Sequence, residues 1–285
     1  MEVWRFALGP LGWSIRYFVQ LMAFLDVHCF SDALGMCVSF YVLLPQQTTR
    51  QIGLAGGEKR AQYQTLYLLH GLSDDHTIWQ RRTSIERYAA AKNLAVVMPA
   101  VARSFYQDMA SGPNYWTFVS EELPALCRQW FPLSGRREDN FVAGLSMGGY
   151  GALRMGLGRP DQFAAAASLS GALDLGRRLR EAGKEGSRIN KAEWTGIFGP
   201  ELKGEGTDAD LFTLAQRLAA SPGPKPRLFL CCGTDDELLG DSRAFHGHLD
   251  GVHLEHTYEE GPGDHEWGYW DAQIQRVLNW LPLAR

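Results

Sequence analysis

Basic residues are scarce relative to acidic ones, and they gather in no run along the chain. The 285 residues hold 28 Lys and Arg against 32 Asp and Glu, which gives a formal net charge of −4. Nucleic-acid binding depends on a basic patch that attracts phosphate groups, so the sequence excludes a nucleic-acid partner. Internal repeats and low-complexity tracts are also absent, which excludes repeat architectures.

Cysteine is sparse and odd in number. The five cysteines, at positions 29, 37, 127, 231 and 232, lack the paired spacing of metal sites. Two of them are adjacent within an apolar run, as is typical of core thiols. We therefore expect reduced thiols in a cytoplasmic protein, with disulfides or a zinc site as the less favoured alternative.

No apolar run is long and uninterrupted enough to span a membrane. Residues 1–21 come nearest, but Arg5, Arg16 and a Gly-Pro pair break them, and a span needs about 20 consecutive apolar residues. Glu2 and the lack of a small-residue cleavage site disfavour a signal peptide. Two interpretations remain, an amphipathic surface hook or an appendage before a domain that begins near Met22. We favour the appendage.

Strands and helices alternate along the remainder of the chain. Apolar runs predict strands at 24–31, 36–44, 65–69, 94–98, 141–143, 163–169, 228–232 and 254–258. From the third strand onward, most of the connections carry helical patterns. This order predicts a single α/β domain over residues 22–285, built on a mostly parallel, doubly wound sheet with helices on both faces.

Residues 171–226, which follow the sixth predicted strand, break the alternation. Their charge is higher, glycine is frequent, and short amphipathic pieces occur at 175–182, 192–198 and 210–219. We interpret this segment as a small cap-like insertion over the carboxyl edge of the sheet, and not as a separate domain.

The strongest motif is Gly144-Leu145-Ser146-Met147-Gly148, which lies between an apolar strand and a helix of small residues. A nucleophilic serine on a sharp strand-to-helix turn needs glycine on both sides, because a β-carbon there would collide with the neighbouring strand or helix. The helix N-terminus and the Met147 N–H would also face a developing oxyanion. A glycine-rich turn with an incidental serine is the alternative.

A serine hydroxyl needs a histidine to take its proton, and the histidine needs a carboxylate to orient it. In sheets of this kind the chain order is Ser, then Asp or Glu, then His. Five histidines follow the strand that ends before Asp236, at positions 246, 248, 253, 256 and 265. Of these, His265 falls on a loop beyond the carboxyl end of a strand, where catalytic groups converge, and it is the predicted base.

The other four histidines raise the question of a metal site. His246 and His248 fall on a predicted helix, whereas His253 and His256 border the last predicted strand. We expect this placement to separate them, and we therefore predict no metal ligands and no cofactor.

The carboxylate and the oxyanion donors are less tightly specified. Asp235, Asp236 and Glu237 all follow the same strand, and mechanism alone does not choose between the two aspartates. A second oxyanion donor is expected from the loop after strand 65–69, where the Leu72 N–H joins that of Met147.

Several of these segments together resemble a known family. They are Tyr67-Leu68-Leu69-His70-Gly71-Leu72, Gly144-Leu145-Ser146-Met147-Gly148-Gly149-Tyr150-Gly151-Ala152, Cys232-Gly233-Thr234-Asp235-Asp236 and Gly263-Asp264-His265-Glu266-Trp267. From about Met22 to the C-terminus, the chain resembles the esterase D group of α/β-hydrolases, and in particular bacterial tributyrin esterase-like carboxylesterases. The resemblance implies the α/β-hydrolase fold. It also implies that the acid is the last residue of a G-x-x-D turn, which is Asp236.

The same group includes S-formylglutathione hydrolases, from which this chain departs at one point. Those enzymes typically read Gly-Leu-Thr-Cys after the oxyanion strand, whereas this chain reads Gly71-Leu72-Ser73-Asp74. The difference favours a general esterase.

The sequence therefore predicts a serine carboxylesterase that hydrolyses short-chain acyl esters through an acyl-enzyme. The alternatives are an acyltransferase or an S-formylglutathione hydrolase-like thioesterase on the same residues. A non-catalytic binding protein is disfavoured because Ser146, Asp236 and His265 are all present. A small-molecule ester is the expected partner, and a homo-oligomer is compatible with the sequence.

Bulky aromatic residues on loops or sheet edges near the opening of the predicted active site are the candidates for the acyl pocket. Each ring taken alone is more typical of a core position than of a pocket. The candidates are Trp79, Tyr115, Trp116, Trp194, Phe198 and Trp267.

Overall fold

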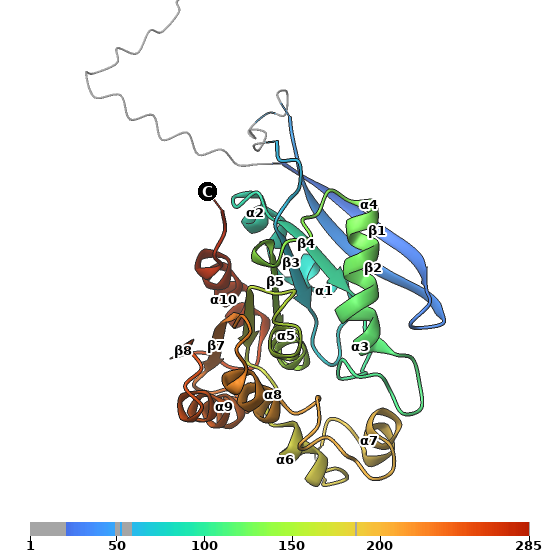
Figure 1. The fold of residues 1–285 in the computed structure, drawn as a ribbon, viewed down its shortest axis with the longest axis vertical. Helices are drawn as coiled ribbons and strands as arrows, with labels where there is room; N and C mark the ends of the chain where they lie inside the picture. The colour runs from blue at the N-terminus through green and yellow to red at the C-terminus, as the bar shows by residue number, and fades with distance from the viewer. Residues whose placement is uncertain (1–20, 49–51, 53–58, 186, 285) are drawn as a thin grey trace, which may run out of the picture.

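The computed structural model describes residues 21–48, 52, 59–185 and 187–284, which fold around one eight-stranded sheet (Figure 1). Its strands are β1 (Leu21–Ser31), β2 (Met36–Gln46), β3 (Thr65–Leu69), β4 (Ala95–Pro99), β5 (Asn140–Leu145), β6 (Ala165–Leu169), β7 (Arg227–Gly233) and β8 (His256–Gly261). The predicted appendage, apart from Leu21, lies outside the described residues.

The strand order is β1-β2-β4-β3-β5-β6-β7-β8, and the strands from β4 to β8 are all parallel. β1 and β2 form an antiparallel hairpin, which joins the sheet by antiparallel pairing of β2 with β4. The turn of this hairpin contains Gly35 at a φ of 65°, a backbone angle that glycine adopts without a steric penalty. The prediction of a mostly parallel α/β-hydrolase sheet is confirmed.

Helices cover both faces of the sheet. They are α1 (Ile78–Arg82), α2 (Ile85–Ala90), α3 (Tyr115–Thr117), α4 (Leu123–Trp130), α5 (Met147–Gly158), α6 (Leu175–Arg180), α7 (Lys191–Phe198), α8 (Leu211–Ala220), α9 (Leu239–Gly251) and α10 (Trp267–Trp280). One apolar core lies between the sheet and α4, α5, α8 and α9. A second core, on the opposite face, contains residues of α1, α2 and α10.

Central strands such as β3 and β5 are buried along their whole length, which explains their continuous apolar sequences. Several predicted strand boundaries differ from the structure by two or three residues. Between α3 and α4 the chain forms a π-helical turn at Phe118–Glu122, where Pro124 has no N–H to donate to the Ser120 carbonyl. The last strand begins at His256, two residues later than expected.

The direction in which successive strands are added to the sheet reverses between β3 and β5. After β3 the chain adds β4 on one side, and it then returns to add β5 to β8 on the other. In open α/β sheets, ligands bind outside the carboxyl ends of the strands at such a reversal point. Figure 1 shows α6 and α7 at the bottom of the view, away from the C-terminus. Within the described part of the chain, no helix has both the length and the apolar character required for crossing a membrane.

Candidate active site

Ser146 lies on a sharp turn between β5 and α5. Its φ of 54° and ψ of −118° are strained for a residue with a side chain, and its N–H donates to the Leu169 carbonyl at 2.9 Å. A β-carbon on Gly148 would lie 2.5 Å from the Leu69 carbonyl oxygen, and one on Gly144 would collide with the Gly148 carbonyl. These two glycines therefore allow the turn that places the Ser146 hydroxyl at the reversal point of the sheet.

Three side chains from different loops form one hydrogen-bonded chain. His265 Nε2 lies 3.0 Å from Ser146 Oγ, and His265 Nδ1 lies 2.9 Å from Asp236 Oδ2 and 3.1 Å from Oδ1. The Asp236 side chain is fully buried, and that of His265 is 10% exposed. The carboxylate can only accept, so Nδ1 carries the proton and Nε2 is left to accept the serine proton.

The loop after β7 buries Asp236 and leaves Asp235 exposed. Gly233 at the end of β7 touches the backbone of Gly263, because a β-carbon on Gly233 would collide with the Gly263 carbonyl. The Asp235 N–H donates to the same carbonyl at 3.0 Å. These contacts join the Asp236 loop to the loop that carries His265.

Asp236 is held in its ionised form despite its burial. Burial alone raises the pKa of this carboxyl group, but hydrogen bonds from His265, from the Leu238 N–H and from Ser170 together lower it below its ordinary value. The bond from the Leu238 N–H is 2.8 Å long. The carboxylate is thus available to orient the imidazole and to stabilise it when it gains a proton.

Sequence reasoning missed two residues that support this arrangement. Trp270 presents its ring to His265 at a centroid distance of 4.9 Å and an interplanar angle of 88°. Its indole N–H donates to Ser170 Oγ at 3.2 Å, and Ser170 in turn lowers the pKa of Asp236. Ser170 directly follows β6, so its place at a carboxyl strand end was the signal that could have identified it.

The loop after β3 is held against the serine by His70. The His70 ring donates from Nδ1 to the Gly71 carbonyl at 2.7 Å and accepts the Val101 N–H on Nε2 at 3.0 Å. Burial lowers the pKa of His70 to about 4. The ring is therefore neutral, with both nitrogens engaged by backbone, and it is not available to carry a proton. A β-carbon on Gly71 would lie 3.7 Å from that of Ser146, so the loop lies close to the nucleophile.

A cavity of about 340 Å³ opens beside Ser146 and His265. Leu72 and Met147, the two predicted oxyanion donors, both line it. Its apolar wall also includes Phe105, Ile189, Trp194 and Leu238, and its charged rim includes Arg177, Arg178, Glu181, Arg188 and Glu237. This volume lies in the range of small-molecule sites.

Of the six predicted pocket aromatics, Trp194 lines the cavity and the other five do not. Trp79 and Tyr115 belong to the two apolar cores, and the Trp79 indole N–H donates to the Leu69 carbonyl. Trp267 packs edge-on against Trp79, with ring centroids 5.3 Å apart. Trp116 and Phe198 line two other hollows. These five therefore do not line the cavity beside Ser146, because their rings pack in the two cores, against Trp79, or at other hollows.

Phe105 is the ring that the sequence did not reveal. It lies 5.0 Å from Trp194 and 5.1 Å from Tyr150 between ring centroids, and its φ of 52° is unusual for a bulky residue. The loop between β4 and α3, which carries it, has no hydrophobic period. The sequence pattern therefore did not indicate that the Phe105 ring would line the cavity.

The expected separation of the other histidines is wrong for one pair. His248 lies beside the Phe212 carbonyl at 2.9 Å, whereas His246 Nδ1 and His256 Nε2 lie 2.7 Å apart. The reason is geometric: β8 begins at His256, next to the last turns of α9, so the helix and the strand bring these two rings together.

The sequence matches the model of the Esterase family over residues 31–281. An acetyl esterase of Caldicellulosiruptor saccharolyticus is 32% identical over 220 residues, which cover 76% of this chain and 82% of the relative. The family match spans the segments that carry Ser146, Asp236 and His265.

Two solved structures of hydrolases are also similar to this chain. The fluorophosphonate-binding serine hydrolase FphF of Staphylococcus aureus is 35% identical, with a TM-score of 0.81 over 91% of this chain and 98% of its own. The S-formylglutathione hydrolase FrmB of the same organism is 35% identical, with a TM-score of 0.79 over 92% and 99% of the two chains. This chain belongs to the Esterase family, and it is a hydrolase with the α/β-hydrolase fold.

Proposed function

We propose that the protein is a serine carboxylesterase that hydrolyses short-chain acyl esters through an acyl-enzyme. The hydrogen-bonded chain from Ser146 through His265 to Asp236, at the wall of the cavity, carries this proposal. Within the family, we assign the chain to the esterase D group near the tributyrin esterase-like enzymes, on the motifs around the same three residues.

In the first half of the reaction, Ser146 Oγ attacks the ester carbonyl carbon while His265 Nε2 takes the hydroxyl proton. The carbonyl oxygen becomes an oxyanion, which the N–H groups of Leu72 and Met147 bind. Each such donor is typically worth about 10²- to 10³-fold in kcat. As the carbon–oxygen bond to the alcohol breaks, protonated His265 gives its proton to the leaving oxygen, and the acyl group stays on Ser146.

In the second half, a water molecule attacks the acyl carbon and its proton passes to His265. The new oxyanion collapses, the bond to Ser146 Oγ breaks, and His265 returns the proton to the serine. The acid product leaves and the enzyme is restored. Asp236 stays ionised throughout and holds the imidazole in one orientation.

The residues that line the cavity favour an ester with a short acyl group and a polar alcohol. The inner wall of the cavity is apolar, and Phe105 and Trp194 stand beside Ser146 where an acyl chain would lie. The rim bears charges of both signs. Arg178 pairs with buried Asp241 at 2.8 Å, and Arg188 pairs with Glu237 at 2.5 Å.

We further propose that residues 171–226 act as a cap-like insertion within a domain that begins near Met22. Two observations support this role. α6 and the segment before α7 supply charged residues of the rim, and α7 supplies Trp194 to the wall. We also place the enzyme in the cytoplasm, because all five cysteines are free thiols.

A reactive-site probe tests the proposed nucleophile. A fluorophosphonate should label the wild type at a single residue, while Ser146→Ala should resist labelling and lose about 10⁶-fold in kcat. The melting temperature of Ser146→Ala should stay close to that of the wild type, because the substitution removes only the hydrogen bond between Ser146 and His265. Labelling that persists in Ser146→Ala would place the nucleophile elsewhere.

A thioesterase is the second candidate, supported by the similarity to the S-formylglutathione hydrolase FrmB. In this chain the Asp74 carboxylate accepts the Gly71 N–H at 3.2 Å, in the loop where that group typically has Gly-Leu-Thr-Cys. Matched acetyl esters and acetyl thioesters should give a higher kcat/KM for the oxygen ester. S-Formylglutathione turned over faster than every oxygen ester would favour the thioesterase.

An acyltransferase would use the same acyl-enzyme and differ in the acceptor. Product analysis with and without an added alcohol distinguishes the two reactions. We expect free acid as the main product in both cases. A new ester that displaces the acid would identify a transferase.

A further inference from the structure

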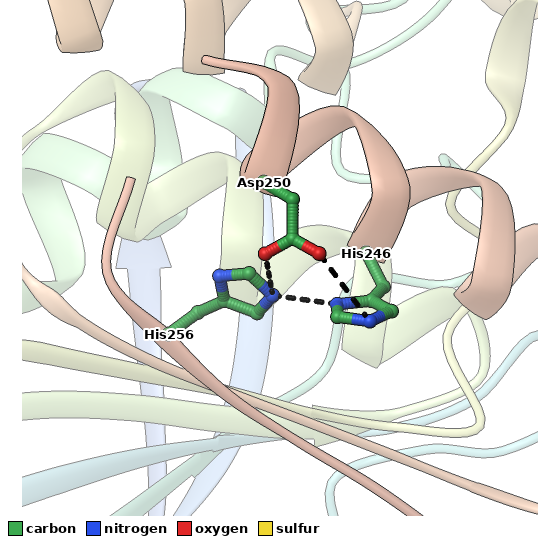
Figure 2. Close-up of side chains that lie close together, drawn as sticks. All are labelled: His246, Asp250 and His256. Carbon is green, nitrogen blue, oxygen red and sulfur yellow. Dashed lines mark hydrogen bonds and ion pairs between the residues drawn. The ribbon is translucent and has the colours of Figure 1, made fainter. Parts of the chain in front are cut away.

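A second group of ligating side chains lies at the far edge of the sheet from Ser146. It consists of His246 and Asp250 on α9 and of His256, the first residue of β8. One ligand atom from each lies within 4.8 Å of the other two. Figure 2 shows the two imidazole rings facing each other with the carboxylate of Asp250 beside both. The amino end of a parallel strand is opposite to its carboxyl end, so this group plays no part in the ester reaction.

One ligand atom from each residue lies close enough to the others for a single ion. His246 Nε2, the nitrogen that faces the carboxylate, lies 3.6 Å from Asp250 Oδ2, and His256 Nε2 lies 3.9 Å from Asp250 Oδ1. Ligands about 2.1 Å from a tetrahedral ion are separated by about 3.4 Å. Without an ion, His246 Nδ1 donates to His256 Nε2 at 2.7 Å, because the proton of the His256 ring is on its Nδ1. Metal binding replaces this hydrogen bond, so a turn of the His246 ring accompanies it.

The two rings are already oriented by their surroundings. His256 Nδ1 lies 2.8 Å from the Leu254 carbonyl, which can only accept, so Nδ1 donates and Nε2 presents its lone pair toward the cluster. The His256 side chain is 5% exposed. The His246 ring is stacked on Tyr258, with centroids 4.1 Å apart and an interplanar angle of 10°. Metal-binding histidines typically donate their other ring N–H to a carbonyl or a carboxylate, as His256 does.

The carboxylate is open to solvent and has no stronger partner. Asp250 is 63% exposed, and within the described part of the chain its ion-pair partners are His246 and His256. His246 and Asp250 are separated by four positions on α9, which places them on one face of the helix. The cluster lines a surface hollow that also contains His253, Glu255 and Tyr258, so an ion can reach it.

We propose that His246, Asp250 and His256 bind one divalent transition-metal ion, with zinc as the best match, and that this ion clips α9 to β8. Two imidazole nitrogens and one carboxylate oxygen suit zinc, while calcium and magnesium prefer oxygen ligands alone. Water completes the coordination. α9 follows Asp236 and β8 precedes His265, so the ion stabilises the unit that carries both residues without touching the substrate.

Titration of the metal-free full-length protein with zinc chloride tests the site. Calorimetry should find one equivalent bound by the wild type, and zinc should raise its melting temperature because it binds the folded state. Loss of a residue that supports a ligand typically lowers metal affinity by about 10- to 100-fold. Asp250→Asn and His256→Gln each remove a ligand, so each should lower zinc affinity at least as much. Cobalt should show visible ligand-field absorption that the same variants lose.

His248→Ala is the matched control, since it removes a histidine two residues away on the same helix. It should bind zinc as the wild type does. Asp250 is on the surface, so Asp250→Asn should fold normally and keep its full rate of ester cleavage. Equal zinc affinity in the wild type and Asp250→Asn would overturn the proposal, as would a wild type that binds no zinc.

The result is separable from the test of the esterase. A chelator should leave ester cleavage unchanged while it lowers the melting temperature of the zinc-loaded protein. If chelation instead abolished cleavage in both the wild type and Asp250→Asn, the proposed serine mechanism would fail, while the titration would still decide the metal site.

Discussion

Asp235 and Asp236 are chain neighbours in opposite environments. Asp236 is buried against His265, whereas Asp235 is exposed and uses its backbone N–H to bond Gly263. The two carboxylates are chemically the same, so burial and contact alone assign their roles. A matched pair of amide substitutions separates them at the residue scale.

Asp236→Asn should lower kcat by about 10⁴-fold, because an amide can donate to the imidazole and favour the wrong tautomer. Asp235→Asn should leave kcat within about twofold of the wild type, since surface substitutions have small effects. Steady-state rates on a short-chain ester, with melting temperatures to check folding, provide the measurement. Equal losses in the two variants would remove the distinction between the aspartates.

At the scale of elements, α7 contributes a single ring to the cavity beside Ser146. Trp194 lines the cavity beside Phe105, while Phe198, four residues further on, contacts Trp194 at a centroid distance of 5.8 Å and lines another hollow. Our sequence interpretation treated Trp194 and Phe198 as equivalent. The geometry now predicts different outcomes for the two substitutions.

Trp194→Ala should raise kcat/KM for octanoyl esters relative to acetyl esters by about tenfold, because forcing extra methylenes into a filled site costs about 1–3 kcal/mol. Phe198→Ala is the control and should change the ratio little. A series of esters with increasing acyl length measures both. The pocket wall would lie elsewhere if Trp194→Ala kept the wild-type ratio or if the wild type already preferred octanoyl esters.

At the scale of the whole molecule, His70 links the loop after β3 to the acid stability of the fold. Its pKa in the folded protein is about 4, because burial disfavours the charged ring. In the unfolded chain an ordinary histidine has a pKa of about 6.5. Between these two values the unfolded state binds a proton that the native state does not, so stability is full above about pH 6.5 and falls as the pH drops toward 4.

His70→Gln removes this titration and keeps one donor and one acceptor in the side chain. Urea unfolding from pH 7 to pH 4.5 should show the wild type losing on the order of 3 kcal/mol more than the variant. The difference between the two curves is the measurement, since other groups titrate in both proteins. Parallel curves would show that His70 is not neutral in the native state at these pH values.

Features that depend on local pattern were predictable from the sequence. The buried strands, the three short helices of the 171–226 segment and the strand-turn-helix around Ser146 follow from apolar period and glycine spacing. His265 could be found because chain order and its place after a strand left no comparable histidine.

Tertiary structure decided whatever depends on the direction of a side chain. Burial of Asp236 follows from the contact between Gly233 and Gly263, which are 30 positions apart. Trp79 packs in a core, and Trp116 and Phe198 line other hollows, whereas Phe105 lines the cavity beside Ser146 from a loop without a hydrophobic period. His246 and His256 meet because β8 starts beside the end of α9. The sequence by itself determined which residues the chemistry can use, and packing between distant segments determined which of them meet.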